Sequence, residues 1–509
     1  MVSNERYSNA KAYAAFKKVR NKLRKYPAAD VVREATRILN SPSISERPNW
    51  YPRHRLLLLV KWAFIYGEEY PRRMRTFGID ELHGLLNLLS DFEGCCRMPS
   101  DFSSLEVWMK AMSHWQFPLQ RGPNQLSWLR PRLLFGCLNS SDYIRREFER
   151  LTSVDLDTFL DLLALTMGYF VVNQGKPVPL RAHYFSTLKT IAAEIVEAFL
   201  GNISLRPREV KPYLERCCHV PPKSWDHELR QESPFKKRPL LHMGDAYHPY
   251  CPHLLSLAME HWPYDLLRKN APERFMGTFG PIFEEYIALG LGGLPLTVHR
   301  ECDLRNQLLG EGKTTDFFVR DGQTNILVDA KAVVMHQLGR VTHDADVVSG
   351  KLKSSILSGV VQGNETAQRL LSLEPEHPIR IGRGNWYLLI ATYDEMFIGN
   401  GADLEKIIGK QHFGSLQNRL PGHAVIPWHH VYFISAGEFD DLIACLQNGH
   451  KLSDILASAA ATDTSPGGKL WTFAQHLSEL SRDLRIPSYL ENEFESLTDR
   501  VSAMIGETN

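Results

Sequence analysis

Two short apolar runs joined by a tight turn constrain the fold of this chain more than any other segment. Residues 317–319 (Phe-Phe-Val) and 326–328 (Ile-Leu-Val) flank a turn at Asp321 and Gly322. An Asp-Gly pair between two apolar runs is typical of a β-hairpin. The sequence therefore predicts two paired strands within residues 314–334, inside a domain that contains a sheet.

Charged residues interrupt these strands at defined places. Asp316 stands at the head of the first strand, and Asp329 and Lys331 stand inside the second. Because strand side chains alternate between two faces, Asp329 and Lys331 share one face. Charges in a buried strand are costly unless something compensates them. Two carboxylates on adjacent strands can meet at one Mg²⁺, so the pattern predicts a metal-dependent hydrolytic site.

The spacing of these residues is similar to a known motif. Asp316, twelve intervening residues and then Asp329-Ala330-Lys331 resemble the PD-(D/E)XK nuclease superfamily, which has the restriction-endonuclease-like fold. The resemblance covers roughly residues 272–436. It includes an upstream helix with a glutamate, for which Glu284 and Glu285 are the competing choices. Thr315 departs from the family pattern, because the proline of the family's name would stand there.

The resemblance implies a chemistry and a role for each residue. Mg²⁺ (or Mn²⁺) would be held by Asp316, Asp329 and the carbonyl of Ala330, and Glu284 would complete the site. Lys331 would position the water that attacks a phosphodiester bond. The implied setting is bacterial defence against phage or foreign DNA, with DNA as the expected substrate and RNA not excluded. The alternatives are a nucleic-acid-binding module that keeps the fold without cutting, and a scaffold that senses a phage or host protein.

The remaining pattern predicts an α+β multidomain chain. At 509 residues it is too long for one ordinary core. We expect a mainly α-helical region over residues 1–220 for sensing or for binding DNA or a partner. A nuclease-like domain with a central mixed sheet should follow over 221–450, and a C-terminal helical extension over 451–509. Within the nuclease-like domain we expect strands at 296–304, 386–394 and 431–436 and a helix around 346–371.

The net charge of +1 hides an uneven distribution. Residues 1–80 hold 17 Lys or Arg against 7 Asp or Glu, so they carry +10 and the remainder carries −9. Such a segment either contacts a polyanion or an acidic partner, or docks on the acidic remainder of the chain. The candidate nucleic-acid contacts are Lys17, Lys18, Arg20, Arg24, Arg72, Arg73, Lys351 and Lys353.

Cysteine usage and hydropathy predict where in the cell the chain resides. The 8 cysteines are sparse and form no CxxC motif, which favours a reducing cytoplasm. The apolar stretches 56–66 and 159–172 are shorter than the roughly 20 residues that span a bilayer, so we expect buried helices and no membrane segment. The sequence leaves open whether the chain forms a homo-oligomer. It also leaves open whether irregularly spaced ligands bind zinc, namely Cys217, His219, Cys251 and His253.

Overall fold

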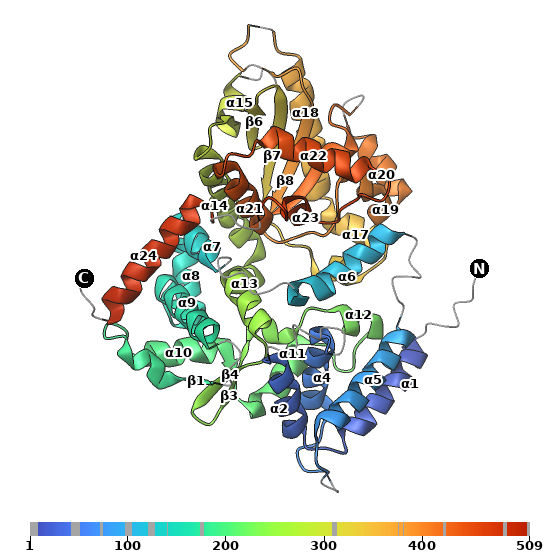
Figure 1. Ribbon diagram of the computed structural model, residues 1–509, viewed down its shortest axis with the longest axis vertical. Helices are drawn as coiled ribbons and strands as arrows, with labels where there is room; N and C mark the ends of the chain where they lie inside the picture. Colours follow the sequence, from blue (N-terminus) through green and yellow to red (C-terminus); the bar gives the residue numbers. More distant parts are fainter. Residues whose placement is uncertain are drawn as a thin grey trace.

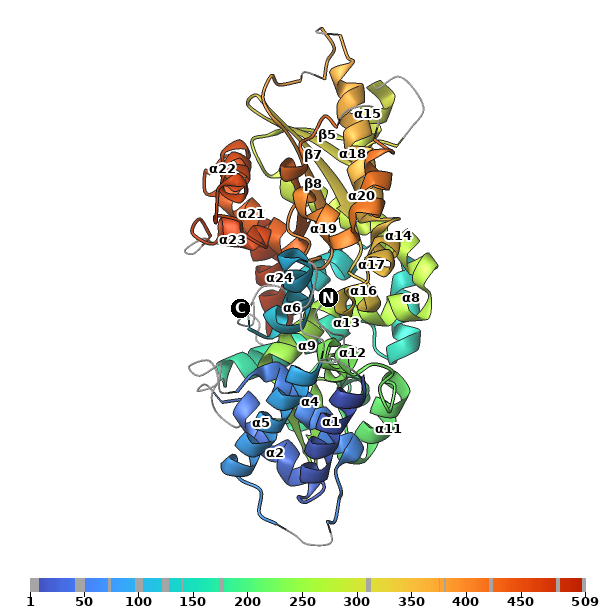
Figure 2. The same cartoon turned by 90° about the vertical axis from the view of Figure 1, so that its right-hand side faces the viewer.

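The computed structural model is α+β with a helical N-terminal part, as predicted, and it contains two small mixed sheets. The molecule is elongated, with the larger sheet near one end and the first helices near the other (Figures 1 and 2). The residues that the structure describes are 9–41, 51–71, 75–96, 104–120, 128–139, 141–173, 178–307, 313–374, 376–379, 381–420, 424–481 and 486–505.

Helices make up most of the first part of the chain. Proline or an extended residue marks many of their starts; α2, for example, begins directly after Pro27. The helices are α1 (Asn9–Leu23), α2 (Ala28–Leu39), α4 (Arg53–Tyr66), α5 (Ile79–Cys95), α6 (Leu105–Gln120), α7 (Leu129–Pro131), α8 (Asp142–Thr152), α9 (Leu156–Val172), α10 (Ala193–Ile203) and α11 (Pro207–Cys217).

The two apolar stretches form buried helices, α4 and α9, as predicted. The charged residues that interrupt them are buried as well, and each has a partner. Lys61 of α4 lies 2.9 Å from Glu228, and Asp161 of α9 pairs with Arg132 and Arg500. Buried charges persist when they are paired and hydrogen-bonded. Within the described residues, we find no helix with the length and apolar character needed to cross a membrane.

A small four-stranded sheet lies in the chain between the first helices and the larger sheet. Sequence patterns did not predict this sheet. Its order is β1-β4-β3-β2, and β3 turns into β4 at Gly244, whose φ of +64° favours glycine. Strands this short carry no readable alternation. They are β1 (Leu180–Arg181), β2 (Ser204–Leu205), β3 (Leu240–Met243) and β4 (Ala246–Pro249).

The larger sheet contains the predicted hairpin. Its order is β5-β6-β7-β8-β9, antiparallel from β5 to β7 and parallel from β7 to β9. Gly322, with φ of +59°, makes the turn between β6 and β7. The strands are β5 (Thr297–Arg300), β6 (Phe317–Asp321), β7 (Thr324–Lys331), β8 (Trp386–Thr392) and β9 (Val431–Ser435).

Two expected elements have different bounds. The strand expected at 296–304 ends at Arg300, because the helix α15 (Glu301–Gln307) begins there. The single helix expected around 346–371 is two helices, α17 (Ala345–Leu352) and α18 (Ile356–Leu371). Both differences arise where polar residues or a turn end an otherwise continuous periodic pattern.

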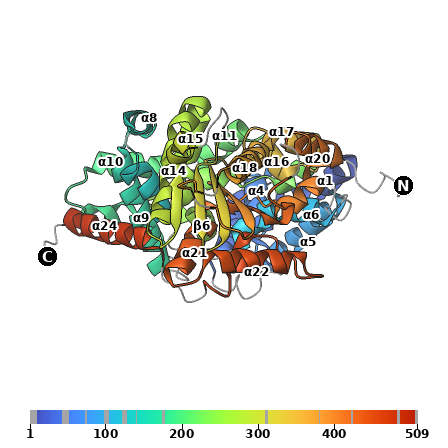
Figure 3. The ribbon, with the colours of Figure 1, turned by 90° about the horizontal axis from the view of Figure 1, so that it is seen from above.

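Helices cover both faces of the larger sheet. Phe317 and Val319 face the core that includes α14 (Pro272–Gly292) and α21 (Ala436–Gln447). Phe318, on the other face, packs in the core that includes α18. Figure 3 shows α18 and α21 on opposite sides of the strands. The hairpin alternation therefore places Asp329, like Leu327, on the α18 face.

The C-terminal helices pack into a core shared with earlier parts of the chain. One apolar cluster extends from Leu129 to Leu497 and includes residues of α9, β6, β7 and α24 (Ser488–Ile505). The remaining α-helices among the described residues are α12 (Trp225–Arg230), α13 (Pro252–Asn270), α16 (Gln337–Val341), α19 (Leu404–Ile408), α20 (Lys410–Gln417), α22 (Leu452–Thr464) and α23 (Phe473–Leu477).

Candidate functional site

The β6–β7 hairpin brings the two predicted aspartates together. Phe317 pairs with Val328 across the strands, so Asp316 at the head of β6 lies opposite Asp329. The backbone N–H of Ala330 donates a hydrogen bond to Asp316 Oδ2 at 2.6 Å. The register of one hairpin therefore fixes both carboxylates.

Lys331 lies beside them on the same face. Its Nζ is 2.8 Å from both carboxylate oxygens of Asp329, but only Oδ1 accepts a hydrogen bond with good geometry. The Asp329 side chain is fully buried, whereas 20% of the Lys331 side-chain surface is exposed. The lysine therefore spans from the buried carboxylate to the surface.

The electrostatics of the pair depend mainly on burial. Burial and the neighbouring charge of Asp329 raise the pKa of Asp316 to about 8, against the lowering effects of Lys331 and the Ala330 N–H. At neutral pH Asp316 therefore retains a proton. A cation bound between the two carboxylates would favour their charged forms and remove the cause of this shift.

The two glutamates of α14 have different surroundings. Glu285 forms a bidentate ion pair with Arg300, at 2.9 and 2.8 Å. Burial first, then the charges of Glu301 and Glu285, raise the pKa of Glu284. Glu284 is also the one whose charge acts on Asp316 and on Lys331. Of the two candidates, Glu284 is electrostatically part of the site.

The donors suit a hard cation, but they do not form a closed ligand shell. Asp316 and Asp329 provide carboxylate oxygens, and Asp329 Oδ2 is buried without a hydrogen-bond partner. Mg²⁺ prefers such ligands. Among the described residues, however, no three His, Cys, Asp or Glu side chains are grouped closely enough to hold a metal ion. In donor chemistry, therefore, the two carboxylates suit Mg²⁺, whereas the described residues provide no third acidic, histidine or cysteine ligand beside them.

Helix α18 packs against the site, and sequence reasoning missed its two closely packed glycines, Gly359 and Gly363. A Cβ added at Gly359 would lie 2.7 Å from Asp329 Oδ2, and one at Gly363 would lie 2.6 Å from Leu388. Gln362 donates to the Thr314 carbonyl, and the Thr366 hydroxyl accepts from Thr315 N–H at 3.1 Å. Two glycines four residues apart on an apolar helix are the signal of close packing that could have revealed them.

The candidate basic contacts lie on separate elements. Lys17, Lys18 and Arg24 are exposed on or just after α1, and Arg20 is half-buried there. Arg24 lies 3.9 Å from Glu68. Lys351 and Lys353 are exposed at the end of α17. Arg72 and Arg73 lie outside the described residues.

The cysteines do not assemble with the histidines named for zinc. All 8 cysteines are free thiols. Cys217 and the neighbouring His219 are exposed, whereas Cys251 is buried in the core that α4 shares. These ligands are not among any metal-holding group of the described residues.

Comparisons with known proteins identify no similar protein. Comparison of the chain with protein-family models, with curated proteins and with solved structures gives no match in any of the three.

Proposed function

We propose that this chain is a Mg²⁺-dependent nuclease that hydrolyses phosphodiester bonds, with DNA as its expected substrate, in bacterial defence against phage or foreign DNA. The observation that carries the proposal is the convergence of Asp316, Asp329 and Lys331 at one end of the β6–β7 hairpin. The topology of helix α14, a three-stranded antiparallel unit, helix α18 and a parallel strand supports the same resemblance.

The two aspartates and the Ala330 carbonyl are the groups that would hold the cation. Bound Mg²⁺ (or Mn²⁺) supplies Lewis acidity and neutralises charge on a phosphate. Asp316, whose pKa is about 8, must release its proton before both carboxylates can serve as ligands. The site therefore favours binding at neutral to alkaline pH.

We assign to Lys331 the contact with the substrate phosphate. Its Nζ combines a contact to the buried Asp329 with partial exposure. From that position it can hold a phosphate oxygen and orient the attacking water, as a fixed positive charge at the reacting phosphate does in other phosphoryl-transfer sites. The positive charge of Lys331 also opposes the rise in the pKa of Glu284 on α14.

Purified full-length protein incubated with plasmid DNA, linear DNA and RNA, with and without Mg²⁺, tests the proposal. We expect Mg²⁺-dependent cleavage of DNA that is lost in Asp329→Asn and in Lys331→Ala. Glu285→Gln is the matched control, because it removes a neighbouring carboxylate that already pairs with Arg300. Wild-type rates in both site variants would refute the assignment.

A second candidate is a module that binds nucleic acid or senses a protein without cutting. The lack of a three-residue metal group among the described residues favours it. DNA binding with no cleavage in Mg²⁺ or Mn²⁺ would support this candidate over the nuclease.

A further inference from the structure

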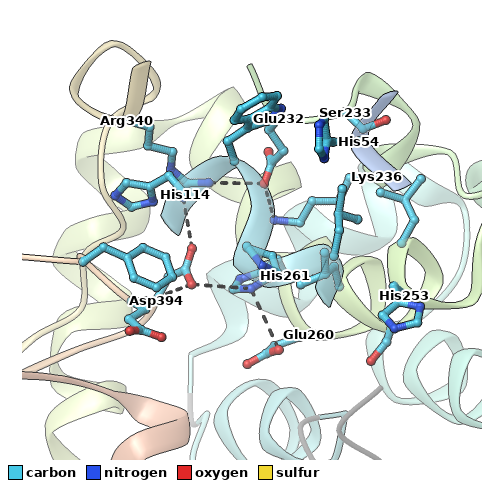
Figure 4. A pocket seen from close by; sticks show the side chains of 18 of the residues that line it. His54, His114, Glu232, Ser233, Lys236, His253, Glu260, His261, Arg340 and Asp394 are labelled. Atoms are coloured by element: carbon cyan, nitrogen blue, oxygen red, sulfur yellow. Dashed lines mark hydrogen bonds and ion pairs between the residues drawn. The ribbon is translucent and has the colours of Figure 1, made fainter. Parts of the chain in front are cut away.

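A cavity of about 230 Å³, lined by apolar as well as charged side chains, lies away from the hairpin, between the first helices and the α/β part of the chain. Its walls come from α4, α6 and α13, from the segment around Glu232, from α16 and from the loop after β8. Figure 4 shows charged side chains and imidazoles surrounding it. It has room for about seven water molecules, or for one small organic molecule.

Carboxylates outnumber cations in the ion-pair network of this wall. Three cations take part: Arg130, Lys236 and Arg340. They are shared among five carboxylates: Glu232, Glu260 and Asp394 line the cavity, whereas Asp265 and Asp440 belong to the network without lining it. With three cations against five carboxylates, the network carries a formal charge of −2, and Glu232, Asp265 and Asp394 keep a quarter or more of their side-chain surface exposed.

The histidines do not supply the missing positive charge. Burial first, then Arg340 and Lys110, hold the pKa of His114 well below its ordinary value. Burial and then Arg53 lower the pKa of His253 to about 4. Both rings are neutral at physiological pH. Even a charged His261 would leave the network negative.

Several acceptors in the wall are incompletely used. The pairs that Glu232 makes with Lys236 and Arg340, at 2.9 and 3.2 Å, both end on Oε1, which leaves Oε2 for another donor. His261 Nε2 stands 4.0 Å from Glu260 Oε2 and 4.0 Å from Asp394 Oδ1. Those separations are too long for hydrogen bonds and leave room for a donor among the three groups.

Glu232 lines the cavity and keeps part of its own side chain open to solvent. Burial is the largest influence on its pKa, which Lys236 and Arg340 nevertheless lower to about 2. Yet 36% of its side-chain surface remains accessible. Glu232 is therefore open to solvent and can accept hydrogen bonds from a ligand that enters the cavity it lines.

Neutral groups and aromatic rings complete the lining. Ser233 Oγ and His253 Nδ1 are buried without a hydrogen-bond partner. Tyr393 and Phe397 also line the space. Aromatic faces combined with carboxylates are the usual surroundings of organic ammonium groups.

We propose that this cavity is a binding site for a small organic cation with a primary ammonium or guanidinium group. The carboxylates of Glu232, Glu260 and Asp394 accept from its N–H donors, and Ser233 and His253 contact its polar far end. An anion is disfavoured because the network is already negative. This inference is independent of the nuclease proposal.

Isothermal titration calorimetry on the full-length protein in Mg²⁺-free buffer tests the site. The probes are 1,4-diaminobutane and agmatine as cations, and inorganic phosphate as the anion. We expect one cationic probe to bind with 1:1 stoichiometry, at least tenfold more weakly to Glu232→Gln, and no phosphate binding.

Two further variants separate the outcomes. Glu34→Gln is the matched control, because it also removes a carboxylate paired with an arginine, but on the surface of α2; its affinity should equal that of the wild type. Ser233→Ala leaves every ion pair intact, so it tests the cavity even if Glu232→Gln does not fold; we expect several-fold weaker binding. The proposal would be overturned if neither cation binds or if phosphate binds in preference to them. It would also be overturned if Glu232→Gln and Ser233→Ala both bind the cation as tightly as the wild type does.

Discussion

Asp316 and Asp329 lie opposite one another across the β6–β7 hairpin, and the N–H of Ala330 donates to Asp316 at 2.6 Å. Burial and the proximity of Asp329 raise the pKa of Asp316 to about 8. Because Asp316 is protonated below that pH, the two carboxyl groups do not repel each other as two negative charges would. This relationship has consequences for stability and for metal binding.

Stability should fall as pH rises through the window set by Asp316. An unfolded Asp ionises near pH 4, whereas the folded Asp316 holds its proton up to about pH 8. Between these values the native state binds more protons than the unfolded state, so the free energy of unfolding decreases with pH. Asp316→Asn should be more stable than the wild type at pH 8 and match it more closely at pH 4. Urea denaturation at several pH values measures this. A wild type that loses no stability relative to Asp316→Asn between pH 4 and pH 8 would contradict it.

Binding of Mg²⁺ should release a proton. Because the cation needs both carboxylates charged, its apparent affinity should rise about tenfold per pH unit up to about pH 8 and level off above it. Titration calorimetry at pH 7 in buffers of different ionisation enthalpy should report release of about one proton. Asp316→Asn should bind more weakly and release none. An affinity that does not change between pH 6 and pH 8 would exclude Asp316 as a ligand.

Gly359 of α18 should tolerate no side chain. An added Cβ would lie 2.7 Å from Asp329 Oδ2 and 3.1 Å from Ile390 Cδ1, both buried, so α18 or β7 would have to shift. We expect Gly359→Ala to destabilise the protein by about 1–3 kcal/mol and to reduce any Mg²⁺-dependent activity. Gly277→Ala on α14, where nothing lies within 4 Å, should instead stabilise by about 0.5–1 kcal/mol. Thermal denaturation of the two variants makes the comparison. Equal stabilities would mean that α18 does not pack as closely as described.

The sequence predicted the hairpin well because local chemistry determines it. The Asp-Gly turn, the apolar alternation and the two charged positions of β7 all point to the same register. The buried helices α4 and α9 were equally predictable from their apolar runs. Such features depend on neighbouring residues in the sequence.

Features that depend on distant residues were not predictable. The partner of Lys61 is Glu228, 167 positions away, and nothing near either residue indicates the other. The strands β1 and β2 have two residues each and exist only through pairing with β4 and β3. The cavity at Glu232 likewise requires residues from many elements at once. For Glu284 and Glu285, the sequence offered two equal candidates, and they are distinguished by the Arg300 pair of Glu285 and by the charge interactions of Glu284 with Asp316 and Lys331.

The buried pair of Lys61 and Glu228 should be strongly coupled. Glu228 accepts from Lys61 Nζ and from Trp62 Nε1, each at 2.9 Å, inside the core of the first helices. Lys61→Met should cost about 3–5 kcal/mol, because it leaves a buried carboxylate without its cation. The double variant Lys61→Met with Glu228→Gln should recover part of that loss. A double-mutant cycle measured by urea denaturation tests this, and additive effects would mean that the two residues do not interact.

The basic residues of α1 should contribute to DNA affinity through phosphate contacts. Deleting residues 1–80 is a poor test, since α1, α2 and α4 supply apolar side chains to a shared core. Replacing Lys17, Lys18 and Arg24 by glutamine changes charge on exposed positions only. Each lost phosphate contact reduces the slope of log Kd against log salt concentration by about 0.9, so the slope should decrease by up to ~2.7.

The control replaces the same number of charges on α8, at Arg145, Arg146 and Arg150, which are all ion-paired. Fluorescence anisotropy at several salt concentrations measures both slopes. If the α1 variant and the α8 control have the same slope as the wild type, α1 docks on a partner or on the acidic part of the chain and does not hold DNA.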